Sequence, residues 1–252
     1  MSREGLSPRR HGDTENDAPK GLTADTNEAL MLRLLCSDEH TGAGRLYSSF
    51  VAALKDARTA TNRDVETGEC DNSSAHGSWL GALGYLALLD QIGKSYAPTS
   101  ESEAIHAGPF KTALLRFAPY TSFGDEIGEL QVETLYGVRC SLAHDFSLLH
   151  RDRRNKFHFH FAFGQGEGAI VTRAERAWDG ESELLPENRT VVNLQRVGDL
   201  VEEIVAVMRR MARERALRCV LPGGIEELRR RYSLVATRSP SVSPCLRGEK
   251  DC

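Results

Sequence analysis

The chain has 252 residues, of which 40% are hydrophobic and 27% are charged, and this composition is typical of a folded protein with a buried core. A formal net charge of −4 gives no overall basic surface, so any nucleic-acid site must be local. The 6 cysteines form no C-x-x-C pair, which excludes a recognisable zinc finger or redox dithiol.

The two ends of the sequence are polar. Residues 1–25 contain no apolar run, so we expect a disordered tail there and no secretory signal. Residues 233–252 predict a second disordered tail, which leaves one domain at residues 26–232. The longest apolar stretch, Trp79 to Leu89, is shorter than the ~20 residues that cross a bilayer. These features predict a cytoplasmic protein with no membrane partner.

Helical periodicity dominates the predicted domain. Apolar residues at helical spacing predict helices near residues 26–35, 46–54, 77–96, 110–117, 123–149, 197–212 and 225–232. The third of these is apolar around most of its circumference, so it belongs in the middle of a bundle. Its glycines Gly81 and Gly84 permit the close approach of a neighbouring helix.

A different period follows the fifth helix. Phenylalanines at 157, 159, 161 and 163 alternate with His158, His160 and Ala162, as in a β-strand. Residues 164–168 are glycine-rich, and residues 169–172 predict a second strand that returns across them as a hairpin. A third strand is predicted at 190–194. The fold class is therefore mainly α, a helical bundle with a small antiparallel β insertion at about residues 155–194, before the last long helix.

Arg139 and His144 are the candidate catalytic residues, near the end of the predicted helix at 123–149. Histidine exchanges protons near neutral pH, because its ordinary pKa is ~6.5. Arginine stays charged and offers planar hydrogen bonds that suit a phosphate. Together the two side chains can cleave an RNA phosphodiester without a metal or other cofactor.

The spacing of this pair leaves alternatives open. Five residues on a helix correspond to about 140° of rotation, so the side chains do not stack in one row. Either Arg139 swings towards the histidine, or a two-fold partner supplies a second copy of each group. In the structural alternative, His144 caps the helix end while Arg139 pairs with Glu133 or Asp145.

The residues from Tyr136 to His144 (YGVRCSLAH) resemble the HEPN superfamily, whose signature is Arg, four to six residues, then His. The resemblance extends loosely over residues 78–218, through the apolar helix, the strands and the last long helix. It implies a HEPN-like helical bundle that forms a homodimer, with the Arg and His of both subunits facing one cleft. Active members are metal-independent endoribonucleases of toxin–antitoxin and phage-defence systems.

Carried over by position, Arg139 stabilises the phosphate and His144 is the general acid/base. Active members often have Asn, Asp or His directly after the Arg, whereas this chain has Cys140, a weak hydrogen-bond donor. Some members are inactive binding modules. Tyr136, Cys140 and Asp145 are the candidate supporting residues, and Asp145 could orient the imidazole.

A basic segment follows the motif and predicts an RNA-binding loop. The candidate RNA-binding residues are Arg151, Arg153, Arg154, Lys156 and His158. A solvated loop without function is the alternative. The HEPN resemblance also implies a further partner, a cognate antitoxin or regulatory protein.

Other features offer competing chemistry. His158 and His160 share one side of their strand and could bind zinc together with His144 or His150. Cys140 could act as a nucleophile beside His144. Residues 164–168 are not a phosphate-binding loop, because no helix with Lys-Ser/Thr follows them. Three functions are thus weighed: a HEPN-type endoribonuclease, an inactive RNA- or protein-binding module, and a metal-dependent hydrolase.

Overall fold

The computed structural model describes residues 27–36, 40–41, 44–70, 79–103, 105–152, 157–181 and 183–235. The predicted tails at 1–25 and 236–252 lie outside these ranges. The second tail was expected from residue 233, but Ser233–Val235 form strand β9, which pairs with β2 (Gly44–Ser48). The ordered region therefore continues past the predicted boundary.

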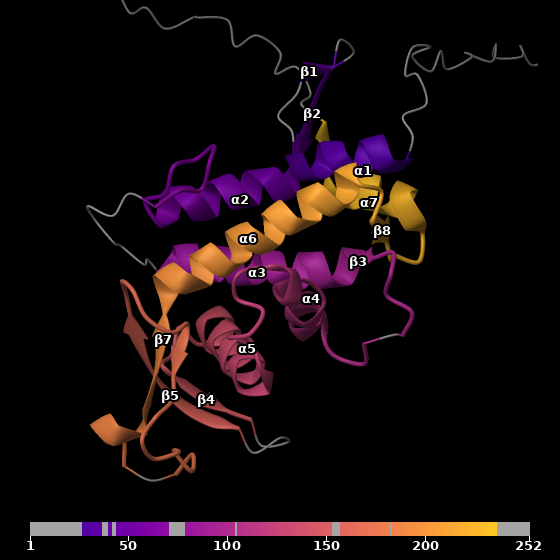
Figure 1. Cartoon of the computed structure of the whole chain (residues 1–252). Helices are drawn as coiled ribbons and strands as arrows, with labels where there is room; N and C mark the ends of the chain where they lie inside the picture. Colours follow the sequence, from indigo (N-terminus) through magenta and orange to yellow (C-terminus); the bar gives the residue numbers. More distant parts are fainter. Residues whose placement is uncertain are drawn as a thin grey trace, which may run out of the picture.

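Helices make up most of the described structure, as the sequence predicts (Figure 1). They are α1 (Asn27–Cys36), α2 (Ser49–Ala60), α3 (Trp79–Ser95), α4 (Pro109–Phe117), α5 (Glu129–His144), α6 (Leu194–Arg213) and α7 (Gly224–Tyr232). One continuous hydrophobic cluster joins these helices to the inner side of a small sheet. Within the described residues, no helix has both the length and the apolar character required to cross a bilayer.

Helix α3 packs against α2, α4, α5 and α6, as expected for a helix in the middle of the bundle, and a narrow stripe with Leu80, Ala87 and Lys94 is exposed. Its glycines explain how the neighbours come so close. A Cβ at Gly84 would lie 3.1 Å from the Cβ of Ala57, and one at Gly81 would meet the side chain of Thr61. Gly93, which the sequence did not single out, is tighter still: its Cβ would lie 1.8 Å from the carbonyl oxygen of Pro109.

Partly buried arginines close the ends of two helices. Arg116 of α4 donates hydrogen bonds of 2.9 Å to the carbonyl of Gly93, in the last turn of α3, and to that of Tyr96, the residue directly after α3. Arg209 of α6 donates one of 2.8 Å to the carbonyl of Leu35, near the end of α1. The carbonyls of Gly93 and Leu35 lie in the last turns, where the helix itself offers no donor, so the arginines supply the missing donors.

A third arginine ties the segment after α2 to α6. Arg58, whose side chain is 3% exposed, forms two hydrogen bonds to the carboxylate of Glu202, at 2.7 and 2.8 Å. Tyr85 of α3 donates to the same carboxylate at 2.8 Å. Arg58 also donates to the carbonyls of Val65 and Glu66, both at 2.7 Å. Every group in this buried network has a partner, as a buried charge requires.

The largest sheet differs from the predicted hairpin. Its strand order is β4 (Leu149–Arg151), β5 (His158–Gly164), β7 (Arg189–Asn193) and β6 (Val171–Thr172). Strand β5 pairs antiparallel with β4 and parallel with β7, whereas β6 pairs only with β7. The prediction that residues 157–163 and 169–172 form one hairpin is therefore wrong, and the sheet is mixed. The glycine-rich turn instead carries the chain past β7.

Some predicted boundaries also move. Helix α5 begins at Glu129 rather than near residue 123 and ends at His144 rather than Leu149. The chain then forms β4, so the β region starts earlier than residue 155. Leu46 was expected in a helix but lies in β2. Two small pairings were not predicted, namely β1 (His40–Thr41) with β2, and β3 (Tyr96–Pro98) with β8 (Leu217–Cys219).

The Gly93 contact gives a test of the packing. Gly93→Ala should lower the free energy of unfolding by about 2 kcal/mol, because overpacking against a backbone carbonyl outweighs the ~1 kcal/mol that alanine adds to helix propensity. Urea unfolding measures the change. Gly84→Ala is the matched control, since it meets only a methyl group at 3.1 Å and should change stability by less than about 1 kcal/mol. Equal effects of the two substitutions would contradict the close α3–α4 contact.

Candidate functional site

Helix α5 lies between α4 and the sheet and carries most of the predicted site (Figure 1). Gly137 faces the sheet, where a Cβ would come within 3.1 Å of the rings of His150 and Phe159. A side chain at this position would push the strands away from the helix. The glycine thus lets the aromatic face of β4 and β5 pack directly on α5.

A strained turn returns the chain from α5 to β4. Phe146 has φ of 47°, in the left-handed region that usually takes glycine after a helix. The backbone N–H of Ser147 donates to the carbonyl of Ser141 at 3.2 Å, and the hydroxyl of Ser141 donates to the carbonyl of Leu149 at 2.9 Å. These bonds fix the direction of β4. They place His150 beside α5, with its ring centroid 6.5 Å from that of Tyr136.

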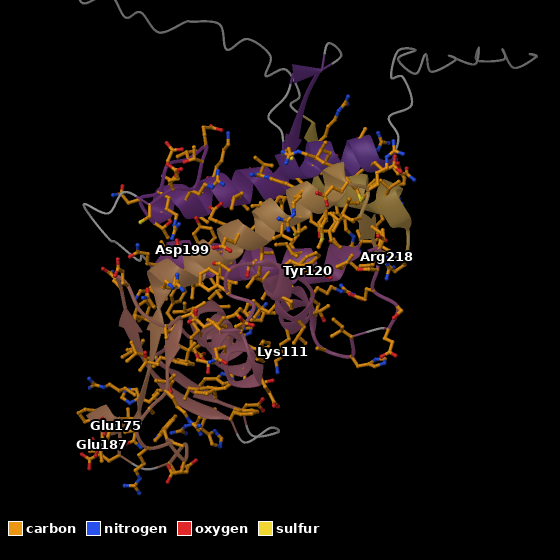
Figure 2. All side chains as sticks on the ribbon, viewed as in Figure 1. Lys111, Tyr120, Glu175, Glu187, Asp199 and Arg218 are labelled. Carbon is orange, nitrogen blue, oxygen red and sulfur yellow. The ribbon has the colours of Figure 1, made fainter. Side chains whose placement is uncertain are left out.

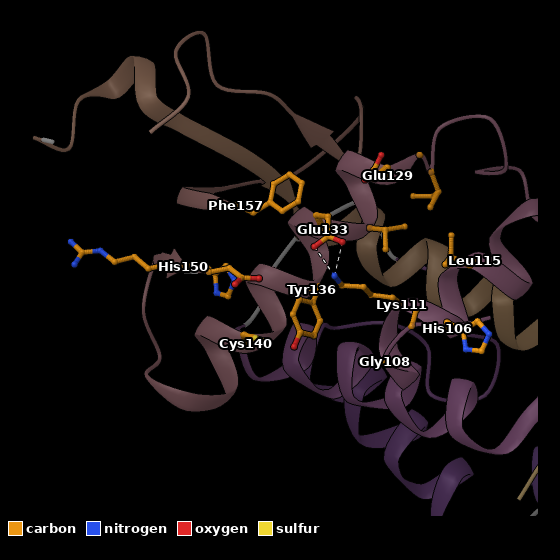
Figure 3. Close-up of a pocket in the computed structure, with 16 residues that line it drawn as sticks. His106, Gly108, Lys111, Leu115, Glu129, Glu133, Tyr136, Cys140, His150 and Phe157 are labelled. Atoms are coloured by element: carbon orange, nitrogen blue, oxygen red, sulfur yellow. Dashed lines mark hydrogen bonds and ion pairs between the residues drawn. The ribbon is translucent and has the colours of Figure 1, made fainter. Parts of the chain in front are cut away.

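A groove of about 920 Å³ runs along one face of α5 (Figure 3). Its walls come from the start of α4, from α5 and from the β4–β5 edge. In its middle, Lys111 of α4 bonds both carboxylate oxygens of Glu133, at 2.5 and 2.6 Å, and also lies 4.6 Å from the ring centroid of Tyr136. Figure 2 shows Lys111 beside α5, with Glu175 and Glu187 at the far end of the sheet region. The groove therefore combines a neutralised ion pair with aromatic walls.

A second hollow of about 390 Å³ adjoins this groove. It is lined by Cys140, Ser141, His144, Asp145, Ser147, Leu149, His150 and Arg151. Cys140, His150 and Arg151 line both spaces, so the two are neighbours along α5. His144 is exposed at the end of the helix, where a ligand from solvent can reach it.

Arg139 lines neither space. Its Nε donates to Asp90 of α3 at 2.8 Å, and its side chain is 28% exposed. Burial lowers the pKa of the guanidinium, but the charge and hydrogen bond of Asp90 overcome that effect and raise it. The alternative that Arg139 pairs with Glu133 or Asp145 is wrong, because Glu133 binds Lys111 and Asp90 is the partner of Arg139. One chain thus does not bring Arg139 and His144 into the same hollow.

The predicted supporting residues divide into two groups. Tyr136 and Cys140 lie one turn apart on the groove face, and their hydrogen bond is the main reason why the pKa of Tyr136 is raised. Asp145 caps α5 through its backbone N–H, which donates to Ser141. No hydrogen bond joins Asp145 to His144 in the described structure, so Asp145 does not orient the imidazole there.

The predicted RNA-binding residues are only partly described. Arg153, Arg154 and Lys156 lie outside the described residues. Arg151 is in strand β4 rather than in a loop, and its guanidinium lies 5.3 Å from the ring centroid of the buried Trp178. Because Arg151 pairs with His158 across the strands, both side chains share the outer face of the sheet. Arg151 is exposed, and it lines both spaces.

The zinc alternative is wrong for the described residues. His150 pairs with Phe159, so it lies on the inner face, whereas His158 and His160 occupy the opposite face. No group of three His, Cys, Asp or Glu side chains suited to a metal occurs in the described part of the chain. The phenylalanines face the core as predicted, but His160 is 8% exposed and does not face solvent.

Comparisons with protein-family models, with curated proteins and with solved structures find no match to this chain. The HEPN resemblance therefore depends on the motif and on the order of the elements.

Three residues of this region were not found from the sequence, namely Asp90, Lys111 and Phe146, and His150 was named only as a zinc ligand and not as an inward-facing residue of the groove. The only signal for the orientation of His150 is the alternation of residues in β5, which turns Phe159 inward. His150 pairs with Phe159 across the strands, so it also points inward, but this follows only once the pairing is known. Asp90 is 49 positions from Arg139 and belongs to another helix, so no local pattern connects them.

Two histidines should make the fold sensitive to acid. Burial is the main cause that lowers the pKa of both His150 and His160 below the ordinary value. As the pH falls below ~6.5, these histidines are protonated in the unfolded chain before they are protonated in the folded protein. The free energy of unfolding therefore decreases from about pH 6.5 down to the lower pKa that each histidine has in the folded state. Each histidine contributes at most ~1.4 kcal/mol per pH unit.

Urea unfolding at pH 7.5, 6.5 and 5.5 measures this loss. His150→Phe and His160→Gln should each reduce the decrease in unfolding free energy between pH 6.5 and 5.5. If the unfolding free energy of both variants decreased as much as that of the unsubstituted protein, His150 and His160 would not be the source of the acid sensitivity.

Proposed function

We propose that this protein is a metal-independent endoribonuclease of HEPN type. His144 would transfer a proton, and Arg139 would stabilise the negative charge that develops on the phosphate. The observation that carries the proposal is the position of His144, which is exposed at the end of α5 in a hollow shared with Arg151. A proton-transfer group beside a fixed cation is the minimum that this reaction requires.

The reaction is an internal transfer within RNA. A base removes the proton of a ribose 2′-hydroxyl, and the 2′-oxygen attacks the adjacent phosphorus. The bond to the 5′-oxygen breaks, and that oxygen receives a proton. The products are a 2′,3′-cyclic phosphate and a free 5′-hydroxyl, so neither water nor a metal enters the balance.

Arg139 fits this role through the way in which it is held. Asp90 accepts from Nε at 2.8 Å, and Cys140 shares a further side-chain hydrogen bond with this guanidinium, which has five N–H donors in all. Asp90 therefore fixes the direction of the guanidinium, and the terminal nitrogens keep donors for a phosphate. Because this group lies outside the hollow of its own chain, we propose that a homodimer supplies Arg139 to the His144 of the partner subunit.

An inactive module that binds RNA or a regulatory protein is the second candidate. The Arg139–Asp90 pair favours it, since a guanidinium already paired with a carboxylate exerts a weaker field on a phosphate. The HEPN resemblance extends both proposals to a setting in bacterial stress response or phage defence, with an antitoxin or regulator as a partner.

Cleavage of unstructured RNA in EDTA tests the enzyme proposal. The protein should cleave under these conditions, while His144→Ala and Arg139→Ala should each lower the rate by about 100-fold or more. Arg218→Ala, at an exposed position on β8 that Figure 2 shows well apart from helix α5, is the control and should leave the rate unchanged. Intact RNA with measurable binding would favour the inactive module, and loss of cleavage in EDTA would contradict the mechanism.

Mixing the two inactive variants tests the shared site. A mixed dimer of Arg139→Ala and His144→Ala keeps one intact Arg139 and one intact His144 on different chains. Cleavage should return in the mixture if the arginine of one chain acts with the histidine of the other. A mixture that forms dimers but stays inactive would place the reaction within one chain.

Phe146 links stability to RNA binding. Its ring is 57% exposed next to His144, where it can stack on a base, and its backbone is strained. Phe146→Gly should raise the free energy of unfolding by about 0.5–1 kcal/mol, because glycine accepts a positive φ. The same change should weaken RNA binding by about 1–3 kcal/mol through the lost stacking.

Fluorescence anisotropy with labelled single-stranded RNA, on the His144→Ala background, measures the binding. Tyr120→Ala removes an aromatic ring that is 47% exposed elsewhere and serves as the control. Unchanged affinity in Phe146→Gly would exclude the stacking role.

A further inference from the structure

The hollow at the end of α5 contains two histidines from one chain. His144 comes from the last turn of the helix, and His150 comes from β4 after the turn at Phe146. Arg151 lines the same space. The motif that suggested RNA cleavage contains only the first of these imidazoles, and nothing in it requires the second.

We propose that His150 is a further catalytic residue, the general base that removes the proton of the 2′-hydroxyl, while His144 of the same chain protonates the leaving 5′-oxygen. This inference rests on the proposed RNA cleavage and assigns its two proton transfers to two different side chains. The reaction needs both transfers, and separate groups in suitable protonation states perform them without waiting for one group to change its state.

The position of His150 is well defined. Its ring is stacked on Phe159, with centroids 6.4 Å apart and planes at 23°, and it meets the ring of Tyr136 edge-on. The Ser141–Leu149 hydrogen bond fixes the preceding residue. Among the described residues, none forms a hydrogen bond to the ring nitrogens of His150, so they remain available to a ligand. A base held by packing alone keeps its nitrogens for the substrate.

The surroundings of His150 favour its neutral form. Burial lowers the pKa of its imidazole, and the charges of His158 and Lys111 act in the same direction, while Asp152 and Glu133 oppose them. The titratable and charged groups around it are Lys111 from α4, Glu133, Tyr136 and Cys140 from α5, Arg151 and Asp152 from β4 and its end, and His158 on the outer side of β5. A neutral imidazole at pH 7 can accept the 2′-hydroxyl proton directly.

The proton balance of the step is complete. His150 takes one proton from the 2′-hydroxyl as the new P–O2′ bond forms. His144 gives one proton to the 5′-oxygen as the P–O5′ bond breaks. The protein ends with one proton moved from His144 to His150, and exchange with solvent restores the starting state.

A purely structural role is the competing explanation, since His150 could serve only as a ring between Tyr136 and Phe159. The variant His150→Phe separates the two roles, because it keeps an aromatic ring in the stack and removes both nitrogens. His150→Gln is measured in parallel in case phenylalanine disturbs the hollow. His160→Gln, on the outer face of the neighbouring strand, is the matched control.

The experiment compares two dinucleotide substrates in EDTA, at temperatures where each variant is folded. One carries the natural 5′-oxygen, and the other carries sulfur in its place. A thiolate leaves without protonation, so the sulfur substrate needs a base but no acid. On the natural substrate, His144→Ala, His150→Phe and His150→Gln should each react about 100-fold or more slowly, and His160→Gln should keep the rate of the unsubstituted protein. On the sulfur substrate, His144→Ala should recover most of its rate, while both His150 variants should remain slow.

The other outcomes overturn the inference in distinguishable ways. His150 variants that cleave the natural substrate at the unsubstituted rate show a structural residue. His150 variants that recover on the sulfur substrate show an acid rather than a base. If the unsubstituted protein cleaves neither substrate, or if His144→Ala is fully active on the natural one, the proposed function itself fails and the role of His150 fails with it.

Discussion

The contact between α3 and α4 at Gly93 sets the geometry on which the site depends. The carbonyl of Pro109 occupies the space of a side chain at Gly93, and Arg116 then bonds two carbonyls at the end of α3. These contacts fix α4 against the central helix within a narrow range of positions, because a backbone carbonyl cannot rotate away. Lys111 is only two residues after Pro109, so the same packing places its ammonium against Glu133 and forms the wall of the groove. A shift of α4 would therefore separate Lys111 from Glu133 and at the same time change the shape of the groove.

The hollow is created by a local conformation that lowers stability. A left-handed residue at 146 is unfavourable for a phenylalanine, and glycine is the usual choice after a helix. The strain is tolerated because the bonds of Ser141 to the following backbone and the packing of His150 against α5 hold the turn. Residues at functional sites are often less favourable for stability than the alternatives, and an exposed aromatic ring in a strained turn beside a histidine has this character.

The sequence predicted the elements whose own residues determine them. Apolar spacing located α1, α3, α4 and α6, and the alternation of phenylalanines located β5. It did not show where α5 stops, because apolar residues continue at helical spacing to Leu149 and neither glycine nor proline marks the end. Strand β4 exists only through its pairing with β5, and the parallel pairing of β5 with β7 depends on contacts across the sheet. For the same reason His144 and Arg139 could be chosen as candidates, while Asp90 and the inward side of His150 required the tertiary structure.

The hydrogen bonds of Arg139 can be compared with those of two other arginines of this chain, Arg58 and Arg116. Arg58 uses Nε and one terminal nitrogen on a carboxylate and its other terminal nitrogen on two carbonyls, and Arg116 is engaged in the same way with Glu101 and two carbonyls. The side chains of these two arginines are at most 10% exposed. Arg139 instead bonds Asp90 through Nε, shares a hydrogen bond with Cys140 and remains 28% exposed. Because its side chain is partly exposed, the donors that protein groups do not occupy can bond water, which costs little free energy. Asp90 therefore holds the guanidinium in place without occupying all of its donors, and the proposed phosphate-binding role of Arg139 depends on the donors that remain.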